Sequence, residues 1–398
     1  MGERGPSLLP GGDLFVILAG MMGALAFWST ALAETAGVLL LVTAASGLVA
    51  GALRHGSFSG GLIVPRYALR LLFVYAAAVC VSIFASGAPL YAHAGLLWHP
   101  LLFPAALLVP IERRALRGAG LLFLSSGAAA SAFALIMNVL LPHHGARFLL
   151  TGLTTFADLL VLAGTVACAF IVQSGLPPAT LLAFAAPLVL IAAGLIWSAE
   201  RAPVAALAAM GSVRFAGAGP RLLAAWVCVA GACLLLSPAA LTDKLGWVVH
   251  GNPIDRYVVW EEGIGKAGHT PLFGFGPGSF ERVLPAEARG RFMNRAPSSW
   301  HNDLLETWLD SGPLAAAAFG GLLLWGVACG LRGVFLQWRR TSLPGGGEPG
   351  FLFLPLAAFG LVGSVVTTSV LGLVFWLLLG LTLNRRTAVN LPAVPRSS

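Results

Sequence analysis

Residues 179–197 read A-T-L-L-A-F-A-A-P-L-V-L-I-A-A-G-L-I-W and contain no charged side chain. A helix needs about 20 such residues to cross the hydrocarbon core of a bilayer. Similar apolar runs recur from residue 14 to residue 383, and 58% of the chain is hydrophobic while only 10% is charged. With a mean hydropathy of +0.86, the chain has more apolar surface than a soluble fold can bury. We therefore predict an all-α polytopic membrane protein.

The apolar runs divide the chain into membrane spans separated by polar loops. We predict about twelve spans, near residues 13–32, 36–53, 69–87, 95–110, 119–141, 157–173, 179–197, 202–216, 221–239, 313–331, 350–368 and 370–383. The chain then has four parts, which are spans one to nine in 1–240, a large loop of short helices in 241–312, spans ten to twelve in 313–386, and a flexible tail in 387–398.

The distribution of Lys and Arg predicts the orientation, because these residues gather in cytoplasmic loops. A cytoplasmic N-terminus places fifteen of the 24 Lys and Arg residues inside and nine outside. Seven of the outer nine lie in residues 241–312, which we call the polar segment. We expect both termini in the cytoplasm and the polar segment on the outer face. Membrane orientation thus explains the net charge of +8 without nucleic acid as a partner.

The polar segment is the only long polar stretch of the chain. It contains Arg256, the turn-rich run G-F-G-P-G-S-F at 274–280, and S-S-W-H-N-D at 298–303. Loops of this length without a functional role are uncommon in compact proteins. We therefore expect the function to lie in this segment.

Three arginines on the predicted outer face could hold an anionic ligand. Arg147 lies in the loop after the fifth span, and Arg201 lies in S-A-E-R-A at the hairpin between spans seven and eight. Arg256 begins a helix-like stretch over 254–264. The planar guanidinium binds phosphate oxygens with two parallel hydrogen bonds and does not lose its charge. This favours a lipid diphosphate as the ligand.

His301 is the candidate general base. The pattern predicts that it begins a helix over 301–309, capped by Ser298 or Ser299. A histidine in the first turn feels the positive end of the helix dipole, which keeps its ring neutral. A neutral imidazole is what a general base needs near pH 7. The apolar stripe of this helix is Leu304, Leu305, Trp308 and Leu309, and its carboxylates, which lie off the stripe, are Asp303, Glu306 and Asp310.

Several of these features have plainer explanations. Arg147, taken alone, is typical of a snorkelling membrane anchor. The run at 274–280 follows no strand and has no Lys, so it indicates a tight turn more than a phosphate loop. His143 and His144 have no third ligand at helical spacing, so we expect no metal. The tryptophans could form an interfacial belt or stack on sugar rings, and they are Trp260, Trp300 and Trp308.

The motifs resemble the O-antigen ligase and polymerase superfamily. The order is S-A-E-R-A in a hairpin, R-Y-V-V-W-E-E, P-L-F-G-F-G-P-G-S-F, and then W-H-N-D-L-L-E-T-W-L-D-S-G, all within 198–312. The number of spans and the large late loop are also similar. The hairpin departs from the family pattern S-R-G, because Ala199 and Glu200 separate Ser198 from Arg201.

The resemblance implies roles for individual residues. Arg201 and Arg256 would hold the undecaprenyl diphosphate of the donor, and His301 would act on the acceptor hydroxyl. Arg147, Trp260 and Asn302 are taken as further substrate-binding residues. No N-P-N element follows Arg147, which leaves its role open.

The expected function is an O-antigen ligase-like glycosyltransferase of the bacterial inner membrane. It would move a glycan from undecaprenyl diphosphate to a lipid A–core hydroxyl on the periplasmic face, with inversion and without a metal or cofactor. A polymerase of the same superfamily, with a carrier-linked glycan as acceptor, is the first alternative. A transporter or flippase is the second, although the predicted spans have almost no charge at mid-depth. Glu34, in the first outer loop, is the carboxylate that could serve as base in a different layout.

Overall fold

The computed structural model describes residues 12–55, 66–89, 93–108, 113–140, 153–172, 178–198, 200–216, 219–235, 255–289, 299–339 and 348–384. Within these ranges the regular structure is entirely helical, as the sequence predicts. The polar segment is described at 255–289 and 299–312, so its first part and residues 290–298 lie outside the described residues. So do Arg147, His143, His144 and the tail at 387–398.

Each predicted apolar run corresponds to one or more helices. The first ten helical elements are α1 (Gly12–Ala26), α2 (Thr30–His55), α3 (Arg66–Ser86), α4 (Ala94–Trp98), η2 (His99–Leu101), α5 (Leu102–Leu108), α6 (Arg113–Leu140), α7 (Leu153–Ile171), α8 (Pro178–Ser198) and α9 (Arg201–Ala216). The others are α10 (Pro220–Leu235), α12 (Asp255–Ala267), α13 (Phe280–Val283), α14 (Ala286–Arg289), α15 (Asp303–Arg339), α16 (Glu348–Val362) and α17 (Ser369–Leu383).

Helix length and composition are consistent with a helical membrane protein. Five helices in the described part of the chain are long and apolar enough to cross a bilayer, at Thr30–Gly47, Arg66–Ser86, Ala115–Leu140, Thr154–Ile171 and Asp303–Phe335. Six other apolar helical stretches have 10–17 residues, fewer than the usual 20 or so. The twelve-span topology therefore stays a prediction.

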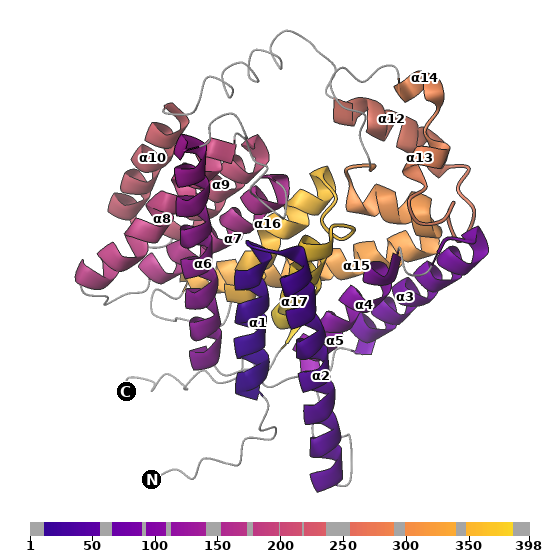
Figure 1. Ribbon diagram of the computed structural model, residues 1–398, viewed down its shortest axis with the longest axis horizontal. Helices are drawn as coiled ribbons and strands as arrows, with labels where there is room; N and C mark the ends of the chain where they lie inside the picture. The colour runs from indigo at the N-terminus through magenta and orange to yellow at the C-terminus, as the bar shows by residue number, and fades with distance from the viewer. Residues whose placement is uncertain are drawn as a thin grey trace.

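The helix α7 lies in the interior of the bundle, as does α17. In the most apolar stretch of α7, 83% of the residues are buried, whereas the corresponding shares are 39% for α3 and 33% for α6. It packs against α6, α8, α9 and α16, and a polar side chain on it therefore faces protein. The long helix α15 packs against α3, α12 and α16 and runs across the molecule from the polar segment (Figure 1).

A break in α15 separates the polar segment from the apolar helix that follows. Gly312 has φ 89° and ψ 170°, a conformation that residues with a Cβ atom rarely adopt. A Cβ atom there would also collide with the carbonyl of Leu272. Pro313 follows and begins the second half of the helix. The sequence predicted this division, with one helix ending near 309 and a span starting at 313.

The polar segment has a small core of its own. Helices α12, α13 and α14 lie together at one end of the molecule, beside the start of α15 (Figure 1). Gly263 of α12 packs so tightly on Trp300 and Leu305 that a Cβ atom would lie within 3 Å of both. This close approach fixes α12 against α15. The buried core residues are Val259, Phe280, Leu284, Ala288, Trp300 and Leu309.

Candidate functional site

The glycine-rich turn at 274–280 is closed by a carboxylate from α15. The backbone N–H groups of Gly278 and Ser279 donate to Asp310 at 3.0 and 3.1 Å, and the Ser279 hydroxyl donates to the same side chain. Arg282 donates to the carbonyls of the turn, including that of Phe275 at 3.0 Å. A side chain of the protein occupies the place that a phosphate would take. This run is therefore a structural turn, as its lack of Lys indicated.

The start of α15 differs from the prediction. The helix begins at Asp303, and its cap is Asn302, whose Oδ1 accepts from the Leu305 N–H at 3.0 Å. The Asn302 Nδ2 donates to the Leu361 carbonyl at 2.9 Å, which ties the cap to α16. Ser299 does not cap the helix, and His301 lies before its first turn. This capping role accounts for Asn302 without a ligand.

The backbone of His301 is held in an unusual conformation. Its φ of 52° makes it the one non-glycine residue with positive φ among the described residues. The indole N–H of Trp260 donates to the carbonyls of Trp300 and His301 at 3.1 and 3.3 Å. Strained residues of this kind persist only where the surroundings fix them, and they gather at functional sites. Trp260 of α12 thus holds the turn that presents His301.

The surroundings of His301 keep its imidazole neutral. Burial lowers the pKa of His301, and the nearby positive charge of Arg256 lowers this pKa further. The sequence predicted correctly that the pKa of His301 is lowered, but the predicted cause, the helix dipole, was wrong. Because the residue precedes α15, desolvation and a neighbouring guanidinium lower the pKa, and the helix dipole is not needed.

Arg256 connects His301 to acidic groups on distant parts of the chain. It interacts electrostatically with Asp158 of α7, which is 7% exposed and also interacts with Glu200. The Thr154 hydroxyl donates to Glu200 at 3.2 Å, which links the start of α7 to the connection between α8 and α9. The guanidinium therefore lies between a histidine of the polar segment and carboxylates of the bundle.

Asp158 is not among the site residues predicted from the sequence, although it lies at the start of the predicted span at 157–173. A single carboxylate within an apolar run is itself a signal, because ionisable groups in such helices usually face the protein interior. In α7 the packing on several sides confirms that Asp158 faces protein.

The backbone of Arg201 lies in the same area. It is the first residue of α9 and follows Glu200 directly, in the tight hairpin that the sequence predicted. Its side chain is not among those that the structure describes. The hairpin is fixed by the Ser198 hydroxyl, which accepts from the Glu200 N–H at 3.3 Å.

The other tryptophans and the carboxylate Glu34, which the sequence also singled out, differ in exposure. Trp300 is fully buried and packs edge to face on Phe280, with ring centroids 4.9 Å apart. It therefore cannot stack on a sugar, whereas Trp308 is 37% exposed. Glu34 lies half-buried in the first turns of α2.

The carboxylate side of α15 is buried. Asp303 accepts from the backbone N–H groups of Val365 and Val366, at distances of 3.0 to 3.2 Å. Glu306 accepts from the Ser364 hydroxyl at 2.8 Å. The exposed fractions of Asp303 and Glu306 are 2% and 8%. The sequence placed these residues off the apolar stripe. In the structure their carboxylates bond to the connection between α16 and α17.

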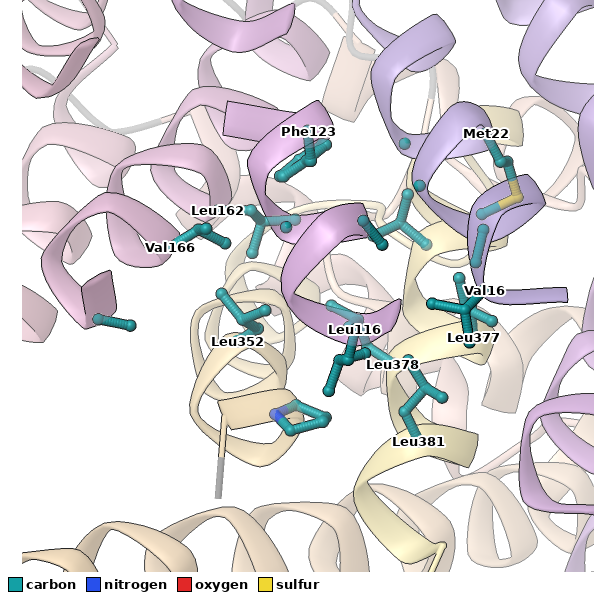
Figure 2. A pocket seen from close by; sticks show the side chains of 18 of the residues that line it. Val16, Met22, Leu116, Phe123, Leu162, Val166, Leu352, Leu377, Leu378 and Leu381 are labelled. Carbon is teal, nitrogen blue, oxygen red and sulfur yellow. The ribbon is translucent and has the colours of Figure 1, made fainter. Parts of the chain in front are cut away.

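An apolar cavity lies elsewhere in the bundle. It encloses about 130 Å³ between α1, α6, α7, α16 and α17 (Figure 2). Its lining includes Val16, Phe123, Leu162 and Leu352 and has no titratable side chain. It adjoins the N-terminal end of α16, whereas Asn302 contacts the C-terminal end of that helix at Leu361. The cavity can hold alkyl groups but has no groups for acid–base chemistry.

Within the described residues, no group of three or more His, Cys, Asp or Glu side chains has a geometry suited to a metal ion. Comparison with protein-family models and with curated proteins found no match for this chain. The candidate site is thus defined by its own geometry, with His301 and Arg256 at its centre.

Proposed function

We propose that the chain is an O-antigen ligase-like glycosyltransferase that uses a polyprenyl diphosphate-linked glycan as donor. The observation that carries the proposal is the pairing of His301 with Arg256. A half-buried histidine with a lowered pKa lies beside a guanidinium, and two tryptophan hydrogen bonds hold its backbone. A neutral base next to a fixed positive charge suits attack by a hydroxyl on a phosphate-activated carbon.

In the proposed reaction His301 takes the proton of the acceptor hydroxyl. The oxygen of that hydroxyl forms a bond to the anomeric carbon, and the bond from this carbon to the diphosphate oxygen breaks. The bonding electrons leave with the diphosphate, whose added charge Arg256 and Arg201 stabilise. The charge grows in the transition state, so the arginines accelerate the step and also bind the donor. Attack opposite the leaving group inverts the anomeric carbon.

The proposal includes a membrane topology. Twelve spans in the bacterial inner membrane would place both termini in the cytoplasm and the polar segment in the periplasm. A reporter enzyme fused after residue 312 is expected to be active on the periplasmic side, and one fused within 341–350 in the cytoplasm. The opposite location at either position would remove the site from the donor's leaflet and refute the proposal.

The acceptor decides between the ligase and its polymerase alternative. A ligase transfers the glycan to lipid A–core, whereas a polymerase transfers it to another carrier-linked glycan. Purified protein in detergent should be supplied with polyprenyl diphosphate-linked glycan and each acceptor in turn, with chelator present. Mass spectrometry of the product identifies the acceptor used.

The control for this experiment is a second histidine of the same segment. His269 is exposed at the end of α12, so His269→Gln should transfer glycan at the wild-type rate while His301→Gln does not. No transfer to either acceptor, together with glycan-lipid movement across vesicles, would favour the transporter alternative. Activity that chelator alone abolishes would mean that a metal takes part.

A further inference from the structure

A series of polar contacts leads from His301 into the protein. The His301 Nδ1 atom lies 3.4 Å from the Ser299 Oγ, and the Ser299 Oγ lies 2.9 Å from the Ser364 Oγ. The Ser364 hydroxyl donates to Glu306 Oε2 at 2.8 Å. The four side chains come from the turn before α15, the first turn of α15, and the connection between α16 and α17. The contacts of Ser364 with Ser299 and Glu306 join residues 65 and 58 positions apart.

When Glu306 is ionised, its carboxylate at the inner end sets the direction of these hydrogen bonds. Each serine hydroxyl has one hydrogen to donate. Ser364 donates its hydrogen to Glu306, so its oxygen accepts from Ser299. The Ser299 hydrogen is then used as well, and its oxygen accepts a hydrogen from His301. The hydrogen on the His301 ring must therefore be on Nδ1.

We infer that Ser299, Ser364 and Glu306 are positioning residues that fix His301 as its Nδ1–H tautomer and leave Nε2 free to accept a proton. The catalytic meaning of this inference rests on the proposed function, because only a base needs a free ring nitrogen. The tautomer itself is a property of the folded chain. The three residues do not contact the substrate.

The surroundings hold the chain of hydrogen bonds in place. The connection that carries Ser364 is fixed by Asp303, which accepts from the N–H groups of Val365 and Val366. The Thr368 hydroxyl donates to the Ser364 carbonyl at 2.5 Å. Glu306 is buried and packed on the same connection. Ser364 therefore has little freedom to turn away from Ser299.

The chain also balances the charge that forms when His301 takes up a proton. Arg256 disfavours an imidazolium at this position. A carboxylate that accepts through two hydroxyls favours the imidazolium, since hydrogen bonding to the charged form stabilises it. Arg256 keeps the resting ring neutral, and Glu306, when it is ionised, stabilises the imidazolium that forms. An orienting carboxylate serves the histidine of a catalytic triad in the same way.

The test is the tautomer of His301, measured by nitrogen NMR of the protein labelled at its imidazoles. The chain has eight histidines, so the His301 signal is assigned as the one that disappears in His301→Gln. At a pH where the ring is neutral and Glu306 is ionised, the wild-type signal should be that of the Nδ1–H form. In Ser364→Ala the Ser299 hydroxyl can donate to Nδ1, and the Nε2–H form should become comparable or dominant.

Two further variants complete the experiment. Glu306→Gln can present either an oxygen or an NH₂ group to Ser364, so it should give a mixture of tautomers. As the control, Thr270→Ala removes a hydroxyl of the polar segment that donates to the Lys266 carbonyl at 3.2 Å, and it should leave the Nδ1–H form unchanged. An Nε2–H ring in the wild type, or an unchanged Nδ1–H ring in both Ser364→Ala and Glu306→Gln, would overturn the inference.

Kinetics then separate this inference from the proposed function. Ser364→Ala should lower kcat for glycan transfer about 10- to 100-fold, a part of the roughly 10²–10⁴-fold that a general base supplies. KM for the donor should change little, because the arginines bind the diphosphate. A wild-type protein with the Nδ1–H tautomer but no transferase activity would refute the function and leave the tautomer assignment standing. An active protein with the other tautomer would refute the assignment alone.

Discussion

The glycine turn at 274–280 and the histidine turn at 299–302 meet in the small core of the polar segment, where Trp300 packs on Phe280. Both are polar and aromatic, and both contact α15. In the glycine turn, Asp310 satisfies the backbone donors and Arg282 satisfies the carbonyls. In the histidine turn, Trp260 and Asn302 hold the backbone, and the charge of Arg256 acts on the His301 ring.

The two turns differ in which of their polar groups already form hydrogen bonds within the protein. The N–H groups of the glycine turn already meet backbone carbonyls or the Asp310 carboxylate. Such a turn has few donors left for a ligand, whatever its resemblance to a phosphate loop. A turn that is fixed through its backbone leaves its side chain free for chemistry. If this contrast holds, substitutions in the glycine turn should affect stability, and substitutions in the histidine turn should affect catalysis.

Loss of His301 should have the largest effect on transfer. In His301→Gln the side chain still forms hydrogen bonds but takes up no proton, so kcat should fall about 10²–10⁴-fold. Donor binding, measured by titration with the polyprenyl diphosphate glycan, should be close to wild type. Full activity of this variant would make the histidine turn structural as well, and the contrast between the turns would disappear.

Loss of Asp310 should affect stability instead. Asp310→Ala leaves two backbone N–H groups and a hydroxyl of the glycine turn without a partner, and each buried unsatisfied group costs about 1–3 kcal/mol. We expect a destabilisation of about 3 kcal/mol or more, measured by thermal unfolding in detergent. Glu287→Ala, which changes an exposed carboxylate of α14, is the control. An unchanged unfolding temperature would contradict the structural role.

Arg256 should contribute chiefly to donor binding. Arg256→Ala should weaken donor affinity by about 1.5–3 kcal/mol, the value of a hydrogen bond to a charged group. Lysine should restore only part of this, because the two-pronged geometry is lost. Lys266→Ala removes a positive charge from the last turn of the same helix and should have little effect. Equal losses in the two alanine variants would point to net charge and not to a specific contact.

The same arginine should shift the pH dependence of transfer. Burial and Arg256 both lower the pKa of His301, so the neutral base persists below its ordinary range and the rate falls only as pH drops through the lowered pKa. Removal of Arg256 should raise this pKa and move the acid limb of kcat against pH to higher pH. A shift to lower pH, or none, would show that Arg256 does not act on His301.

Trp260 should have the smallest effect. Trp260→Phe removes the donor to the carbonyls of Trp300 and His301 but keeps an aromatic ring in the core. We expect a loss of about 1 kcal/mol, or roughly five-fold in kcat, because one neutral hydrogen bond is lost. Trp308→Phe, at a partly exposed position of α15, is the control. Identical results for both would mean that the Trp260 hydrogen bonds do not hold the His301 turn.

Much of the local structure could be predicted from the sequence because its causes are local. The break between a helix ending near 309 and one beginning at Pro313 follows from Gly312, and the hairpin at Arg201 follows from the short polar interruption of two apolar runs. The start of α15 was placed two residues too early. Ser299 and Asn302 are both good caps, and only the contact of Asn302 with Leu361 selects between them.

The sequence by itself determined that this chain is helical and apolar, that its polar chemistry is concentrated in one segment, and that His301 and Arg256 belong to that segment. These properties follow from composition and periodicity, which act over a few residues. Only the tertiary structure decided that Asp158 lies near Arg256, that Asp310 fills the glycine turn, and that Ser364 reaches Ser299. Such contacts join residues about 30 to 100 positions apart, and they depend on how helices pack, which no local pattern records.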